Sequence, residues 1–266
     1  ATNANTLVFR ATFTEDVINV TTGDFMVSGT STASVSDISA VSASVYDITV
    51  SGGNLASFTG AVGLNLAAGQ DITDLIGNAL PTVEPDTDDG FDVDHAAPTV
   101  TLSSTAADPS NANLIPVLVT FSESVSGFEP TDIVITNGTL RDFVPSGTTT
   151  TFNITPAGQG LITVNIAANI ATDAAGNSNT AATQLSRVYD TVRPTVGITT
   201  ASNPTKASPI VFTITFSEPV TGLAVGGITV EAVPAYNTDK KFHPKADGKL
   251  GFVVTVDGVR IYHAGD

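Results

Sequence analysis

Short runs of alternating apolar and polar residues dominate the middle of this chain, and this is the pattern of half-buried β-strands. The clearest runs lie at 116–122, 148–154 and 161–166. Turn-forming pairs such as Asn137-Gly138 separate the runs, and no segment keeps the 3.6-residue spacing of a helix. The apolar residues are mostly Val, Ile and Ala, and the first two suit a pleated surface. We therefore predict an all-β chain.

The segment 98–193 contains enough strands for one complete sandwich of two sheets. Its strands are predicted at 99–103, 116–122, 132–136, 140–144, 148–154, 161–166 and 182–189. The strand at 140–144 has the weakest alternation. Strands this short, with turns between them, are typical of an immunoglobulin-like domain.

A repeated motif divides the chain into three copies. It reads Phe13-Thr14-Glu15-Asp16-Val17, then Phe121-Ser122-Glu123-Ser124-Val125, then Phe216-Ser217-Glu218-Pro219-Val220, with spacings of 108 and 95 residues. These spacings are too long for a solenoid repeat and suit one sandwich per copy. The expected domains are 1–97, which lacks its first strand, 98–193, which is complete, and 194–266, which is partial.

Further landmarks in the middle copy are specific to one kind of repeat. They are the opening Pro98-Thr99-Val100, the turn Asp173-Ala174-Ala175-Gly176-Asn177 and the closing Tyr189-Asp190. Together with the repeated motif, they resemble the bacterial immunoglobulin-like repeats of surface adhesins, over roughly residues 1–230. The resemblance implies tandem immunoglobulin-like Greek-key β-sandwiches and a location outside the cell or on its surface.

Acidic residues recur where the predicted strands end. Glu123 ends the second strand of the middle copy, Asp173 ends the sixth, and Asp94 lies just before the first. Since successive strands run in opposite directions, these three carboxylates should meet at the junction of the first two copies. Oxygen-only ligands suit Ca²⁺, and a cation relieves the repulsion between the acids. We predict a structural calcium site there, with related sites formed by Asp190 with Glu218 at the next junction and by Glu15 with Asp74 at the first pole.

A turn without metal explains the same residues equally well. In an Asp-x-x-Gly-Asn turn the Asp side chain bonds the backbone, and Gly or Asn takes the left-handed conformation. The acidic run Asp86, Asp88, Asp89, Asp92 and Asp94 lacks the spacing of an EF-hand loop, so we expect it to be a solvated strand edge.

Charge and composition exclude several classes of function. A net charge of −16 argues against a nucleic-acid partner, because phosphate binding needs clustered Lys and Arg. No apolar run reaches the length of about 18 residues that membrane insertion needs. The absence of Cys excludes disulfides and thiolate chemistry. We find no Gly-x-Ser-x-Gly and no P-loop, and expect no enzyme.

Residues 227–266 depart from the repeat pattern. The stretches Lys241-Phe242-His243-Pro244-Lys245 and His263-Ala264-Gly265-Asp266 resemble an internal piece of a metallo-β-lactamase-fold hydrolase, in which Asp266 matches a metal ligand. The main His-x-His-x-Asp-His motif of that family is missing, so no hydrolase is expected. Alternation at Phe252, Val254 and Val256, with a turn at Asp257-Gly258, predicts a hairpin that fills part of the third sandwich.

These observations predict a non-catalytic spacer or stalk of a bacterial secreted or cell-surface, adhesin-like protein, stiffened by calcium between domains. Its partners would be neighbouring immunoglobulin-like domains of the same or adjacent chains. Two alternatives stay open. Residue 1 aligns with Pro109, after the first strand, so the chain could form filaments by accepting a strand from a neighbour. It could also bind a surface glycan or host protein, although it has no Trp and only four Tyr.

Overall fold

The chain is all-β in the computed structural model, which describes residues 1–83, 89–200, 211–224, 228–234, 250–256 and 258–263. Its strands are joined by turns and by short 3-10 helices at Thr22–Asp24, Leu55–Ser57 and Pro130–Asp132. The chain divides into two compact units, Ala1–Thr191 and Val192–Asp266. The first unit contains two sandwiches. Among the described residues, no helix is long and apolar enough to cross a membrane.

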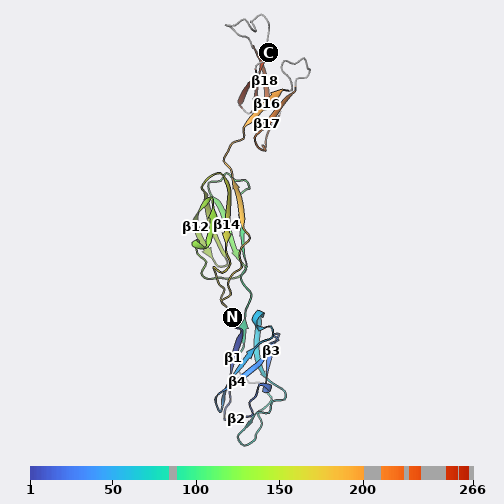
Figure 1. Cartoon of the computed structure of the whole chain (residues 1–266), viewed down its shortest axis with the longest axis vertical. Helices are drawn as coiled ribbons and strands as arrows, with labels where there is room; N and C mark the ends of the chain where they lie inside the picture. Colours follow the sequence, from blue (N-terminus) through green and yellow to red (C-terminus); the bar gives the residue numbers. More distant parts are fainter. Residues whose placement is uncertain (84–88, 201–210, 225–227, 235–249, 257, 264–266) are drawn as a thin grey trace. The chain divides into compact units, whose positions relative to one another are not determined.

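The second sandwich carries the labels β12 and β14 in Figure 1. It has two antiparallel sheets, with strand orders β12-β13-β10-β9 and β11-β14-β15. In the lettering of immunoglobulin domains, strands A, B, E and D form one sheet and C, F and G the other. The predicted fold class is therefore confirmed. The strands are β9 (Val100–Ser103), β10 (Ile115–Phe121), β11 (Ile133–Thr136), β12 (Gly138–Ser146), β13 (Thr149–Pro156), β14 (Gly160–Ile166) and β15 (Leu185–Tyr189).

The core of this sandwich follows from the alternation seen in the sequence. In β10, every second residue from Ile115 to Phe121 is buried. The side chains of β13 and β14 close the core from the two sheets. Burying one such aliphatic or aromatic side chain contributes about 1.5–3 kcal/mol. The buried residues are Val100, Ile115, Val117, Val119, Phe121, Ile133, Phe152, Ile154, Ile162, Val164, Ile166 and Ala171.

The strand with the weakest pattern differs most from its prediction. Instead of a short strand at 140–144, β12 runs from Gly138 to Ser146. Its pairing with β13 shifts between Arg141 and Val144, and Asp142 lies there with φ of 54°. A β-bulge adds a residue to one strand and breaks the period of two. The bulge therefore explains why the alternation was hard to see.

The first sandwich repeats this plan with sheets β1-β5-β4 and β3-β6-β8, and a small pair β2-β7. Its core includes Leu7 and Phe9 from β1 and Ile48 and Val50 from β5. The strands are β1 (Thr6–Thr12), β2 (Val17–Ile18), β3 (Phe25–Gly29), β4 (Ser34–Ser42), β5 (Val45–Ser51), β6 (Gly60–Leu66), β7 (Thr73–Asp74) and β8 (Phe91–Val93). Of the acidic run before the junction, Asp86 and Asp88 lie outside the described residues, and Asp92 is exposed in β8.

The two sandwiches differ at one sheet edge. In the second, β9 pairs with β10 on the side away from β13. In the first, the described strands include none beside β1 except β5. Both sandwiches nevertheless have a short parallel β-bridge to their last strand. It joins Thr2 to Val93 in the first sandwich and Ser110 to Tyr189 in the second. The edge of β1 that faces away from β5 is therefore free within the described structure.

The second unit contains two described sheets. One pairs β16 (Val196–Thr200) with β17 (Phe212–Phe216), and the other has the order β18-β19-β20. The expected hairpin is present, because β19 (Leu250–Val256) pairs with β20 (Val259–His263), and β18 (Ile228–Pro234) joins it along β19. Its predicted alternation is not kept, since Val253 and Val254 are both buried. Lys241 to Lys245 and Asp266 lie outside the described residues.

Candidate metal centre

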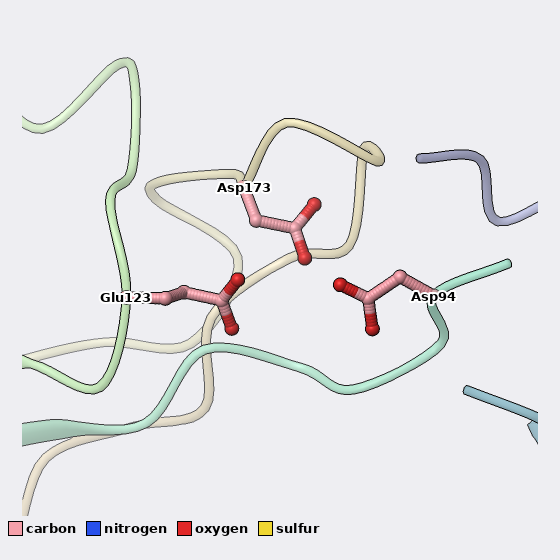
Figure 2. Close-up of side chains that lie close together, drawn as sticks. All are labelled: Asp94, Glu123 and Asp173. Atoms are coloured by element: carbon pink, nitrogen blue, oxygen red, sulfur yellow. The ribbon is translucent and has the colours of Figure 1, made fainter. Parts of the chain in front are cut away.

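Three carboxylates from separate segments meet at the junction of the first two sandwiches. One oxygen each from Asp94, Glu123 and Asp173 lies within 4.8 Å of the other two. Figure 2 shows the three side chains directed toward one another. Asp94 directly follows β8, Glu123 follows the end of β10, and Asp173 lies in the loop after β14. The convergence that strand directions predict is confirmed.

Asp173 is held by the turn that the sequence indicated. Its Oδ1 accepts the backbone N–H groups of Ala175 and Asn177, each at 2.8 Å, and its Oδ2 accepts the Asn177 side-chain amide at 2.9 Å. Gly176 takes the left-handed conformation, with φ of 93°. Burial of Asp173 opposes ionisation, but the hydrogen bonds from Asn177, Ala175 and Gly176 outweigh it and lower its pKa. The turn thus presents a fixed, ionised carboxylate.

Glu123 is the group in this cluster without a partner. Its carboxylate accepts no hydrogen bond from the described residues and takes part in no ion pair there. Burial raises its pKa, and the charges of Asp173 and Asp94 raise it further. A half-buried carboxylate that faces two others is unfavourable unless a proton or a cation joins it.

Asp94 connects the cluster to the first sandwich. Its backbone N–H donates to the Thr2 carbonyl at 2.8 Å. Its Oδ1 accepts the Ala96 N–H at 2.9 Å and the Thr59 hydroxyl at 3.3 Å. Glu123 and Asp173 belong to the second sandwich, so the three carboxylates of the cluster come from both sandwiches.

The donor set fits Ca²⁺. Calcium takes six to eight oxygen ligands at about 2.3–2.6 Å, so two oxygens on one ion lie at most about 5 Å apart. The 4.8 Å limit among the three carboxylate oxygens meets this condition. Asp94, Glu123 and Asp173 would hold the ion, and their second oxygens and water would complete its shell. The chemistry that the ion supplies is charge neutralisation.

Asn177 is a junction residue that the sequence reasoning did not single out as functional. Its side-chain amide donates to the backbone carbonyl of Asp94 at 2.8 Å, and its Oδ1 accepts the Asn3 amide at 3.3 Å. Asn78 occupies the same place in the first-copy turn, so the repeated Asn was the available signal. The repetition of this Asn did not indicate that Asn177 also forms hydrogen bonds with the neighbouring sandwich.

The structure also brings Glu15 and Asp74 together. Both line a shallow pocket of about 310 Å³ at the pole of the first sandwich, with Asp16, Leu75 and Ile76. The Asn78 backbone N–H, at 2.8 Å, and its side-chain amide, at 2.6 Å, bond Asp74 and lower its pKa. Among the described residues, the acids of this pole do not bring three carboxylate oxygens as close together as those of the junction.

Asp190 and Glu218 belong to different units, and a metal site formed by them stays a prediction. Asp190 accepts the side-chain amide of Gln159, and its N–H donates to the Ser110 carbonyl at 2.9 Å. Glu218 follows β17, and its Oε1 is buried without a hydrogen-bond partner among the described residues.

Solved structures that match this chain resemble it only distantly. No curated protein matches the chain. The solved structure of FdeC, described as an Escherichia coli adhesin, is 13% identical with a TM-score of 0.37, and the match covers 99% of this chain and 98% of that one. Invasin, described as a bacterial integrin-binding protein, is 11% identical with a TM-score of 0.29, over 95% of this chain and 52% of its own. This chain thus spans about half of the invasin structure.

The family comparison concerns the segment that holds the cluster. The matched range ends well before residues 227–266, so the comparison gives no support to the resemblance of these residues to a metallo-β-lactamase-fold hydrolase. Asp94, Glu123 and Asp173 all lie inside the matched range. Residues 94–189 match the family described as the bacterial Ig-like domain.

Proposed function

We propose that this chain is a non-catalytic spacer of a bacterial secreted or cell-surface, adhesin-like protein, and that calcium stiffens the junction between its first two sandwiches. The observation that carries the proposal is the position of Glu123. It faces Asp94 and Asp173 with no hydrogen-bond donor and no ion-pair partner among the described residues. A divalent cation supplies what this carboxylate lacks.

The electrostatics favour a cation over an empty cluster. Two unit charges about 4 Å apart interact with about 4 kcal/mol at an effective dielectric constant of about 20. Repulsion of this order among three acids destabilises the junction in the absence of an ion. A bound Ca²⁺ converts the repulsion into attraction and stabilises the folded state by mass action.

Stiffness follows from where the ligands originate. Asp94 is fixed to the first sandwich by Thr2 and Thr59, and Asp173 is fixed to the second by its own turn. The chain between Asp94 and Val100 of β9 is short but contains no strand. An ion bound to both sides adds a connection to this linker and to the hydrogen bonds of Asn177 with Asp94 and Asn3, and each added connection restricts bending further.

The other two predicted acid pairs and the glycan-binding role have weaker support than the junction site. Glu15 with Asp74, and Asp190 with Glu218, would bind calcium more weakly than the junction, where three carboxylates converge. A glycan-binding role has less support, because no Phe or Tyr is among the exposed large hydrophobic side chains of the described residues.

Residual dipolar couplings measured on the full chain test the stiffening. With calcium, both sandwiches of the first unit should report one common alignment tensor, and with EGTA they should report two. Glu123→Gln should behave like the EGTA sample even when calcium is present. Asp37→Asn, which removes an exposed charge from β4, should behave like the unaltered chain. Equal tensors in all samples, or tensors that calcium leaves different, would contradict the proposal.

A further inference from the structure

The outer face of the four-stranded sheet of the second sandwich carries a hollow of about 230 Å³. Its floor is the side of β10 that faces away from the core, where Pro116 and Leu118 are exposed. Across the sheet, Leu118 lies between Ser103 of β9 and Thr151 of β13. Pro116 lies opposite Asn153 of β13. The hollow therefore has an apolar floor between polar side chains of the two neighbouring strands.

The β-bulge in β12 forms one wall of this hollow. Asp142 lies in the bulge in the left-handed conformation, with φ of 54°, and lines the hollow beside Asn153. The Asn153 side-chain amide donates to Oδ2 of Asp142 at 3.0 Å. A bulge redirects a side chain relative to a regular strand, and Asn153 then holds the redirected carboxylate in place. Oδ1 of Asp142 accepts no hydrogen bond from the described residues, so it is available to a ligand.

Hydroxyl groups without a hydrogen-bond partner form much of the remaining rim. Ser103, Thr105 and Thr151 line the hollow and are exposed, and their hydroxyls bond to no other residue that the structure describes. Each hydroxyl can donate one hydrogen bond and accept others. Ser104 differs, because its hydroxyl donates to the Pro116 carbonyl at 2.6 Å. Free donors and acceptors thus surround the apolar floor.

Size and charge restrict the kind of ligand that the hollow can take. Its volume of about 230 Å³ is below the roughly 300–1,000 Å³ of sites for drug-sized molecules, so it suits a single ring. Its described lining contains one carboxylate, that of Asp142, and no Lys or Arg, so an acidic ligand would be repelled. One carboxylate among neutral hydroxyls is also a poor donor set for Ca²⁺. A neutral ring that carries several hydroxyls and an apolar C–H face fits these conditions.

We propose that this hollow binds one neutral sugar ring of a surface glycan. Hydroxyls of the ring donate to Oδ1 of Asp142, and such bonds to an ionised acceptor are stronger than those between neutral groups. Other hydroxyls bond Ser103 and Thr151, while C–H groups of the ring pack on Leu118. The floor is aliphatic, and it offers less contact area than an aromatic ring, so a single hollow binds weakly. This binding goes beyond the role of a spacer and does not depend on calcium.

NMR titration of the full chain with the methyl glycosides of glucose, galactose and mannose tests the proposal. At least one of these neutral sugars should cause saturable shift changes at the Asn153 side-chain amide and the Thr151 backbone amide, with a dissociation constant in the millimolar range. The methyl glycoside of glucuronic acid, which has the ring of glucose and a negative charge, should bind more weakly than that of glucose. Titrations with calcium and with EGTA should agree, which separates this binding from the junction.

Two variants test the groups that the proposal assigns. Asp142→Asn removes the carboxylate and keeps a residue that tolerates the left-handed conformation, so the bulge should persist. It should weaken binding about tenfold, because hydrogen bonds to a charged group are lost. Leu118→Ser, which removes the exposed floor, should also weaken binding. The matched controls are Asp37→Asn, on β4 of the first sandwich, and Val134→Ser, exposed on the other sheet of the second, and both should bind as the unaltered chain does.

Several results would overturn the proposal. They are the absence of a saturable response to all three neutral sugars, shift changes centred away from the hollow, and equal binding after Asp142→Asn and Leu118→Ser. Tighter binding of the glucuronic acid glycoside than of the glucose glycoside would contradict the assignment to neutral sugars.

Discussion

The side-chain amide of Asn177 donates to the backbone carbonyl of Asp94 at 2.8 Å, across the junction of two sandwiches. The same amide group donates to Oδ2 of Asp173 at 2.9 Å. One side chain therefore connects the turn that positions a candidate calcium ligand to the backbone of another. The metal cluster and the direct contact between the sandwiches share this residue, so the two should be coupled energetically.

Replacing Asn177 with Ala should destabilise the first unit more than the same replacement in the first-copy turn. Asn177→Ala removes the side-chain bonds to Asp173, Asp94 and Asn3, whereas Asn78→Ala removes only the equivalent side-chain bond to Asp74. A hydrogen bond contributes about 0.5–1.5 kcal/mol net, and the two variants differ by two such bonds, so their free energies of unfolding should differ by about 1–3 kcal/mol. Urea denaturation with EGTA measures both variants. Equal losses would show that the bonds of Asn177 to Asp94 and Asn3 contribute nothing.

The pKa of Glu123 predicts an unusual pH dependence without calcium. A carboxyl whose pKa is raised in the folded state binds its proton more tightly there than in the unfolded chain. Stability therefore falls as the pH rises from about 4.5 through the raised value, and the loss is complete above it. Glu123→Gln should remove this decrease and make the calcium-free protein more stable at neutral pH.

Urea denaturation between pH 4 and 7 in EGTA would reveal this effect. The difference between the unaltered chain and Glu123→Gln should grow with pH and favour the variant. With calcium at pH 7, the unaltered chain should instead be more stable than Glu123→Gln, because only the unaltered chain keeps all three carboxylates that bind the ion. A constant difference over this pH range would show that the neighbouring charges do not act on Glu123.

The two Asp-x-x-Gly-Asn turns predict the opposite trend in acid. The pKa values of Asp74 and Asp173 are both lowered, so their ionised forms stabilise the fold above about pH 3.8. This contribution should be lost as the pH falls through the lowered folded values. Asp74→Asn and Asp173→Asn should each reduce the slope of stability against pH in this range. Slopes identical to that of the unaltered chain would mean that the turn bonds do not depend on ionisation.

The sequence was sufficient to predict the fold because the apolar period is simple where the sheets are regular. The strands β10 and β14 follow their predicted ranges to within about one residue at each end. The prediction was poor at β12, where a bulge at Asp142 interrupts the period. It was also poor in β19, where Val253 and Val254 are both buried. Both exceptions depend on contacts with neighbouring strands, and the apolar pattern of one strand alone does not reveal them.

The meeting of the carboxylates in the candidate site was predictable from the sequence, because it follows from the topology of the sandwich. Opposite strand directions bring the end of β10 and the end of β14 to one pole, so Glu123 and Asp173 had to meet there. The two interpretations of the Asp173 turn, structural and ligating, prove compatible, since its backbone bonds leave the carboxylate facing Glu123. The role of Asn177 at the junction was not predictable, because it depends on how the first sandwich contacts that turn.

Calcium titration by isothermal calorimetry tests the central claim most directly. The unaltered chain should show a saturable site, and Glu123→Gln should weaken it at least tenfold. Glu15→Gln, which alters the acidic pole of the first sandwich, should leave this site unchanged and so separates the junction from the pole. A chain that binds no calcium, or binds it equally well after Glu123→Gln, would contradict the account.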